Sequence, residues 1–183
     1  MQEEKKLTGL QQFIKDKPTP EEIVIKYCES EKKENALAFI ACLEENKTPL
    51  RFSRSSPNLF EAKYKSKNIC NLTVAWQTGD WKVRLQLTHV ESYKEAIFNE
   101  ALQEIIWNSL AFCIYSERSP YFGMKKAPGC SPNKPCKGGK NKIVLGKEVK
   151  VCHTSVSFSN PDDAAIKIMK RLLELEKQAR YNV

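Results

Sequence analysis

The chain has 183 residues, of which 41% are hydrophobic and 28% are charged, and its formal net charge is +8. This balance indicates a globular protein with a sizeable core and excludes a disordered chain. No apolar run approaches the roughly 20 residues that span a bilayer, so we expect no membrane partner. The charged N-terminus MQEEKKLTGL lacks a signal-peptide pattern, which predicts a cytoplasmic protein.

The N-terminal part of the chain predicts helices. Apolar residues recur at helical spacing over residues 3–15. The sequence PTPEE then predicts a new helix, because Thr19 can cap it, Pro20 fits its first turn and Glu22 completes a capping box. After the charged stretch ESEKKEN, a further helix is predicted with this apolar face: Ala36, Phe39, Ile40 and Leu43.

Between residues 50 and 90 the apolar period changes to two, as in half-buried strands. TGD at 78–80 predicts the turn of a hairpin, with Gly79 supplying the permissive backbone. One face of the predicted sheet is apolar: Leu72, Val74, Trp76, Trp81, Val83, Leu85 and Leu87. The opposite face is polar and basic, with Lys63, Lys65, Lys82 and Arg84.

The second half of the chain predicts a long helix, a loop, two strands and a last helix. Residues 92–115 have the strongest helical periodicity. Residues 116–142 have no periodic pattern, and loops of that length in compact domains are usually functional or disordered. A strand period returns over residues 142–159, with Gly146 as a turn, and the following helix is predicted to be capped by Asn160.

The order of these elements predicts one α+β domain, with an antiparallel sheet and helices packed on one of its faces. Residues 1–48 are its N-terminal helical segment, which precedes the sheet. Residues 49–183 are its α+β core and contain the long basic loop 116–142. The sequence shows neither a linker that would separate two domains nor an internal repeat.

The loop holds the main candidate site, a structural zinc ion. Cys130 and Cys136 are separated by five residues in APGCSPNKPCKGGKNK, and with Cys152 they supply three of the thiolates that zinc prefers. Cys113 or His153 supplies a fourth ligand. The spacing is longer than in common zinc knuckles, so two other interpretations stay open: a redox or disulfide pair, and structural thiols beside a loop.

Positive charge is concentrated in the same loop. Residues 116–142 contain seven Lys or Arg and one acidic residue, a net charge of +6. The predicted contacts to an anion or a nucleic acid are Lys125, Lys126, Lys134, Lys137 and Lys140. With the basic face of the sheet, they predict a nucleic-acid-binding accessory domain as the alternative function.

Catalysis has little support in the sequence. The chain has two histidines, His89 and His153, and neither a GxSxG nor an HExxH motif occurs. A Cys–His nucleophile pair is a third interpretation. We predict a non-enzymatic module that binds or senses a small ligand or a protein partner, with a ligand pocket at Trp107, which falls off the main apolar stripe.

The segments AKYKSKNIC, GKEVKVC and NPDDAAIKIMKRLLEL resemble small bacterial proteins of a domain-of-unknown-function family, over roughly residues 55–175. This resemblance implies no activity and transfers no catalytic or binding residue. The order of elements is also similar to that of ligand-sensing domains of the gyrase-inhibitor-like group. That likeness concerns topology alone, which does not fix function.

Overall fold

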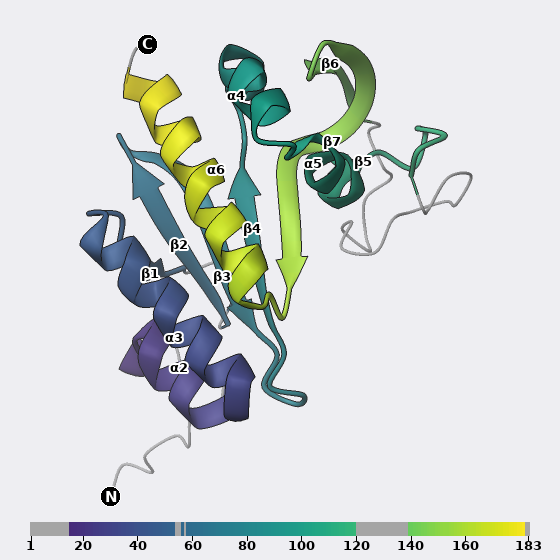
Figure 1. The fold of residues 1–183 in the computed structure, drawn as a ribbon. Helices are drawn as coiled ribbons and strands as arrows, with labels where there is room; N and C mark the ends of the chain where they lie inside the picture. The colour runs from purple at the N-terminus through teal and green to yellow at the C-terminus, as the bar shows by residue number, and fades with distance from the viewer. Residues whose placement is uncertain (1–14, 54–55, 57, 120–138, 182–183) are drawn as a thin grey trace, which may run out of the picture. The chain divides into compact units, whose positions relative to one another are not determined.

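The structure, a computed structural model, describes residues 15–53, 56, 58–119 and 139–181 (Figure 1). Its elements in chain order are α2 (Pro20–Tyr27), α3 (Ser30–Glu45), β1 (Leu50–Phe52), β2 (Leu59–Tyr64), β3 (Lys67–Val74), β4 (Trp81–Gln86), the 3-10 helix η1 (Val90–Tyr93), α4 (Lys94–Asn99), α5 (Gln103–Ser109), β5 (Leu110–Phe112), β6 (Lys140–Val144), β7 (Lys147–Ser159) and α6 (Asp163–Tyr181). Helices precede an antiparallel sheet, so the predicted α+β class is confirmed. None of the described helices is long and apolar enough to cross a membrane.

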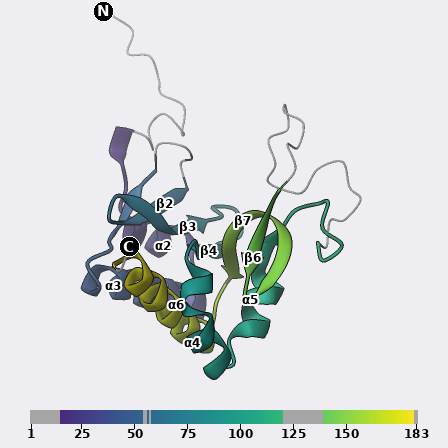
Figure 2. The same ribbon diagram turned by 90° about the horizontal axis from the view of Figure 1, so that it is seen from above.

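The strands of the described residues form a seven-stranded antiparallel sheet. Its order is β1-β2-β3-β4-β7-β5, and β6 pairs with β7 outside that order. In β4, buried Trp81 and Val83 flank exposed Lys82, which is the period of two expected for a strand with one buried face. The strands β6 and β7 run side by side in Figure 2, and their turn at Gly146, with a φ of 75°, lies where the sequence predicts it.

Two compact units divide the described part of the chain. The described residues of 1–83 and 159–167 form unit 1, and those of 84–158 and 168–183 form unit 2. Unit 1 contains α2, α3, β1, β2, β3 and the start of α6, whereas unit 2 contains η1, α4, α5, β5, β6 and the rest of α6. The strands β4 and β7 contribute residues to both units.

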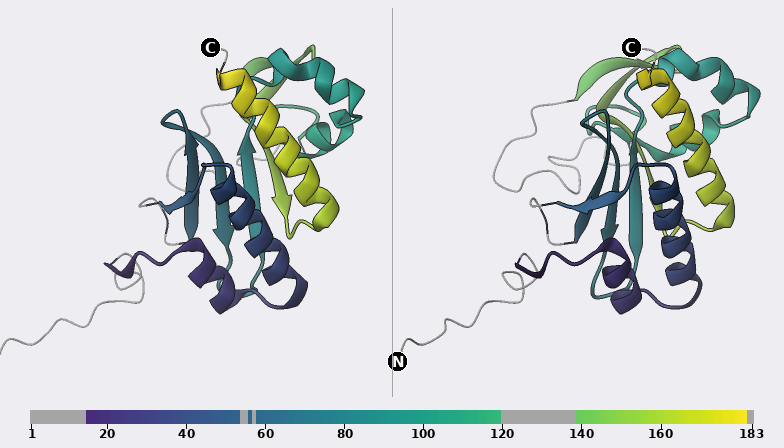
Figure 3. Two further views of the ribbon diagram at one scale, coloured as in Figure 1. Left: turned by 60° about the vertical axis from the view of Figure 1, so that its left-hand side comes forward. Right: turned by 90° about the vertical axis from the view of Figure 1, so that its left-hand side faces the viewer.

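In unit 1, α2 begins with the predicted capping box. The Thr19 hydroxyl accepts a hydrogen bond from Glu22 N at 3.2 Å, and Thr19 N donates to the Glu22 carboxylate at 2.7 Å. Pro20 occupies the first turn, where its missing N–H costs no hydrogen bond. Helix α2 packs against α3 (Figure 3). In the core beneath them, the ring centroid of Phe39 lies 6.2 Å from that of Trp81.

The β3–β4 hairpin meets the end of α2 at Gly79. This glycine has a φ of 65°, and a Cβ atom there would lie 2.4 Å from the carbonyl oxygen of Tyr27. Glycine is therefore required both for the backbone conformation and for the close approach. Beside it, the Asp80 carboxylate accepts a hydrogen bond from Lys32 Nζ at 2.6 Å. That ion pair joins the hairpin to α3.

The single helix predicted over residues 92–115 is wrong, because the segment forms η1, α4, α5 and β5. Helix α4 ends where Ala101 adopts a φ of 54°. Ala101 N donates to Phe98 O at 3.1 Å, and Leu102 N donates to Ile97 O at 2.9 Å. Together these bonds form a Schellman motif, which usually has glycine at the left-handed position. Because the residue here is alanine and not glycine, the sequence does not indicate that the helix ends at this point.

The N-cap of α6 is Asp162 rather than the predicted Asn160. The Asp162 Oδ1 atom accepts a hydrogen bond from Ala165 N at 2.8 Å, which is the contact of an N-cap. Asn160 lies in unit 1 and has a different role. Its Oδ1 accepts from Trp81 N at 2.9 Å, and its Nδ2 donates to Asp80 at 2.7 Å. Asn160 therefore holds the start of β4.

Candidate functional site

Part of the predicted loop site lies outside the described residues: Cys130, Cys136, Lys125, Lys126, Lys134 and Lys137. The predicted site residues that the structure does describe all belong to unit 2: Trp107, Cys113, Lys140, Cys152 and His153. In the described part of the chain, no three His, Cys, Asp or Glu side chains are grouped so that they could hold a metal ion. A zinc ion held by the loop cysteines therefore stays a prediction.

The structure brings Cys113 and Cys152 together. Cys113 is fully buried, with 0% exposure, whereas Cys152 is half-buried. Their side chains share a hydrogen bond. Cys113 N also donates to Lys150 O at 3.1 Å, which places Cys113 directly beside β7. Two of the predicted metal ligands are thus neighbours.

The sulfur of Cys113 lies among groups that favour its anionic form. The Gly139 N–H donates to it at 2.9 Å, and a Cβ atom on Gly139 would lie 2.7 Å from Cys113 Cβ, so a larger residue would not fit. Burial raises the pKa of the Cys113 thiol. Hydrogen bonds from the backbone of Tyr115, from Gly139 and from Cys152, with the charge of Lys150, outweigh burial and lower that pKa overall.

His153 does not complete a metal-ligand group with Cys113 and Cys152 among the described residues. Desolvation lowers the pKa of His153, and the charges of Arg84 and Lys142 lower it further. The imidazole thus lies in the field of two cations, a position that favours its neutral form.

Trp107 on α5 lies within a stack of side chains. Its ring is nearly parallel to that of Phe112, with an interplanar angle of 10° and centroids 6.3 Å apart. Arg118 Cζ lies 5.3 Å and Lys147 Nζ 5.7 Å from the Trp107 ring centroid. The cavities lined by described residues at Tyr27, Pro18 and Pro49 do not include Trp107. A ligand pocket at this residue stays a prediction.

Unit 2 carries a set of cations that we call the basic cluster: Arg84, Arg118, Lys140, Lys142, Lys147 and Lys150. None of them has a carboxylate within ion-pair distance among the described residues. By contrast, Arg171 and Arg180 of α6 pair with Glu100 and Glu176. Lys150 Nζ lies 5.6 Å from the ring centroid of Tyr115, which is 54% exposed. Within the described part of the chain, the basic cluster therefore combines cations that lack a carboxylate partner with an exposed ring.

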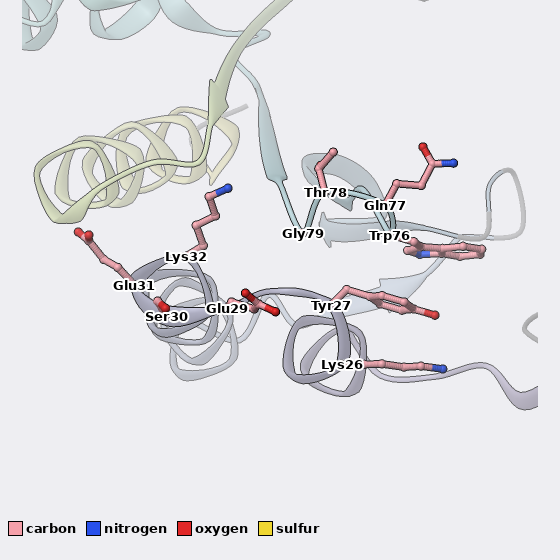
Figure 4. A pocket seen from close by; sticks show the side chains of 10 residues that line it. All are labelled: Lys26, Tyr27, Glu29, Ser30, Glu31, Lys32, Trp76, Gln77, Thr78 and Gly79. Atoms are coloured by element: carbon pink, nitrogen blue, oxygen red, sulfur yellow. The ribbon is translucent and has the colours of Figure 1, made fainter.

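Unit 1 contains an open groove of about 740 Å³ between the end of α2 and the β3–β4 turn (Figure 4). Tyr27 and Trp76 stack along one side, with centroids 5.8 Å apart and an interplanar angle of 15°. Lys26 Nζ lies 5.2 Å from the Tyr27 centroid. Trp76 was predicted on the buried face of a strand, but β3 ends at Val74 and Trp76 is half-buried in this groove.

A buried ion pair in unit 2 was not predicted. Glu176, which is 0% exposed, accepts a hydrogen bond from Arg180 Nε at 2.8 Å. It also accepts from Tyr93 Oη and Thr88 Oγ1, each at 2.8 Å. The signal in the sequence was spacing, because positions 176 and 180 continue the row that begins at buried Leu172. Because both residues are charged, the apolar pattern of the sequence does not assign them to the buried face of α6.

No family model, no curated protein and no solved structure matches this chain. The resemblance to small bacterial proteins therefore stays an expectation. The fold and the sites define an α+β protein with a basic cluster, a pair of cysteines and an aromatic groove.

Proposed function

We propose that the protein binds single-stranded nucleic acid through the basic cluster of unit 2. The observation that carries this proposal is the arrangement at Trp107, where Arg118 and Lys147 both lie over one ring. Proteins that hold single strands without sequence preference combine cations for the phosphates with rings on which bases stack. The basic cluster offers both kinds of group.

The distribution of charge supports the same function. Residues 118–153 contain nine Lys or Arg against one acidic residue, Glu148, so this segment alone has the net charge of +8 that the whole chain has. Cations that bind phosphates release the counterions of the nucleic acid, and this release supplies most of the affinity in non-specific binding. Cations already paired with carboxylates would contribute less.

Tyr115 is the described ring best suited to stack on a base. It is 54% exposed, and Lys150 lies beside it to meet a phosphate. One face of Trp107, in contrast, is already covered by Phe112. We therefore assign base stacking to Tyr115, and phosphate binding to Arg118, Lys147 and Lys150.

The test is a fluorescence anisotropy titration of the full chain with a labelled oligothymidine of about 12 nucleotides, a length within the site sizes of single-strand binders. The logarithm of the association constant should fall linearly with the logarithm of salt concentration, by about 0.7 per phosphate contact. Tyr115→Leu should weaken binding by about 1–3 kcal/mol. The double variant Arg118→Gln/Lys147→Gln should reduce the salt slope. Affinity that does not depend on salt would overturn the proposal.

Two matched control variants test whether binding depends on residues of the basic cluster or on any exposed ring or charge. Tyr181 is a tyrosine 71% exposed at the end of α6, and Lys167 is an exposed lysine in the same helix. Tyr181→Leu and Lys167→Gln should bind as the wild type does. Equal weakening in the controls would show that the assignment to the basic cluster is wrong. Equal affinity for heparin would indicate a general polyanion site.

A second candidate function, the binding of a small planar ligand, is favoured by the groove of unit 1. Its volume of about 740 Å³ lies within the range of roughly 300–1,000 Å³ of ligand pockets. The parallel rings of Tyr27 and Trp76 would stack on a flat ligand. A screen of heteroaromatic compounds by tryptophan fluorescence tests this function. Quenching should be lost in Trp76→Leu and kept in Trp107→Leu, and the reverse result would exclude the groove.

A further inference from the structure

We propose that Cys113 and Cys152 bind a thiophilic metal ion, Cu(I) or Zn(II), through their sulfur atoms. The two side chains share a hydrogen bond in unit 2. Cys113 is fully buried and Cys152 is half-buried, so the pair has one sulfur in the interior and one that solvent reaches. The site adjoins Lys150 of the basic cluster, but its metal ligands are thiols rather than cations, so the loss of metal binding and the loss of nucleic-acid binding can be measured separately.

The strand register favours a metal ion over a disulfide. Because Cys113 N donates to Lys150 O, Cys113 lies opposite Lys150 and diagonal to Cys152. Diagonal neighbours in antiparallel strands have Cα atoms about 7–8 Å apart. A disulfide needs Cα atoms about 4.4–6.8 Å apart. A metal ion with metal–sulfur bonds of about 2.3 Å spans the larger separation.

The surroundings of Cys113 suit a sulfur that carries negative charge. Two backbone N–H groups, from Gly139 at 2.9 Å and from Tyr115, donate to it. Hydrogen bonds of this kind orient the ligands of metal sites and tune the metal. The charge of Lys150 acts on the same sulfur. It would offset the net negative charge of a Cu(I) ion held by two thiolates.

The number of ligands distinguishes the two ions. In the part of the chain that the structure describes, the pair is not extended to three ligands. Two thiolates satisfy Cu(I), which soft sulfur donors select. Zn(II) in proteins takes four ligands and would need additional ones. The pair by itself therefore matches the coordination of Cu(I).

The experiment uses the full chain, reduced and kept without oxygen. Cu(I) is titrated against bicinchoninate and Zn(II) against a chromophoric chelator, and the alkylation of Cys152 by iodoacetamide is mapped by mass spectrometry. We expect one ion per chain, which protects Cys152. Cys113→Ser and Cys152→Ser should each weaken binding about tenfold or more. The matched control Cys42→Ser changes a half-buried thiol of α3 in unit 1 and should have no effect.

Unchanged metal affinity in both serine variants would overturn the proposal, because the metal would then be held by other residues. A Cys113–Cys152 disulfide that forms in air, found by peptide mapping, would overturn the register argument and with it the proposal. If the serine variants fail to fold, the protection of Cys152 in the wild-type chain tests the proposal instead. An absence of Cys152 protection at saturating Cu(I) and Zn(II) overturns the proposal, whereas protection by either ion supports it and identifies the ion.

Discussion

Glu176 shows how unit 2 accommodates a buried carboxylate. Burial raises the pKa of Glu176, but hydrogen bonds from His89, Arg180, Thr88 and Tyr93 outweigh burial and hold that pKa below its ordinary value. Glu176 and Arg180 are 0% and 5% exposed, so solvent screens neither charge. Removal of one member of such a pair leaves the other charge buried without compensation.

Glu176→Met should therefore lower the free energy of unfolding by about 3–5 kcal/mol. The double variant Glu176→Met/Arg180→Met should lower it less, because both charges are replaced by apolar side chains of similar length. Urea unfolding followed by circular dichroism measures both losses. An equal loss of unfolding free energy in the double and single variants would contradict this explanation. It would show that the packing around Glu176 matters, rather than the uncompensated charge of Arg180.

Asp80 makes the stability of unit 1 depend on pH. Hydrogen bonds from Lys32, Thr78 and Asn160 lower the pKa of Asp80 from 3.8 to about 2. Because the pKa is lower in the folded state, the stabilisation is complete above the unfolded pKa and is lost as the pH falls through the folded value. The stability difference between the wild type and Asp80→Asn should therefore shrink from about pH 4 to pH 2. Thermal melts across this interval measure it, and a constant difference would contradict the ion pair.

Among the helices and strands, the sequence predicted the boundaries that local chemistry sets. The capping box at Thr19 and the turn at Gly146 are examples, because their residue types act within a few positions. The break of the predicted helix 92–115 could not be found in this way. It depends on a left-handed Ala101, and an apolar period continues through that residue without interruption.

The two left-handed glycines of the hairpin turns provide a matched test of packing. Gly79 and Gly146 have φ values of +65° and +75°, but only a Cβ atom on Gly79 meets a neighbour, Tyr27 O at 2.4 Å. Gly146→Ala should cost about 1–2 kcal/mol through backbone strain alone. Gly79→Ala should cost about 1–3 kcal/mol more, because the hairpin must move away from α2. Equal losses in urea unfolding would contradict this close approach.

Strand register explains why the candidate site was predicted only in part. The sequence named Cys113, Cys152 and His153 as metal ligands from their residue types. The structure places the two cysteines together, while His153 lies near Arg84 and Lys142. A one-residue change of register moves a side chain to the other face of a sheet, and pairing between distant strands is not encoded in a local period.

For the molecule as a whole, the main feature is that neither unit is a continuous piece of chain. Unit 1 is completed by residues 159–167, which follow most of unit 2 in the sequence. Within that segment, the Asn160 side chain bonds to Trp81 N and to Asp80. The start of β4 therefore depends on residues that come much later.

A chain that ends at Phe158 should lose the cooperative unfolding of unit 1, although it retains residues 15–83. Tryptophan fluorescence during thermal melting compares it with the full chain. Asn160→Ala in the full chain is the control, because it keeps residues 159–167 but removes the Asn160 hydrogen bonds and places alanine at a φ of 44°. It should cost about 1–3 kcal/mol. A sharp, wild-type melt of the shortened chain would show that unit 1 folds without residues 159–167.

The same discontinuity determines when the protein can fold during its synthesis. The hydrogen bond from Trp81 to Asn160 joins residues 79 apart in the chain, and that from Thr88 to Glu176 joins residues 88 apart. Contacts of such separation carry a large loop-closure entropy, and they slow folding. Unit 1 is complete only when residue 167, near the start of α6, has been synthesised, and unit 2 only when the rest of α6 has followed. Both units therefore reach their final packing only after every described strand has been synthesised.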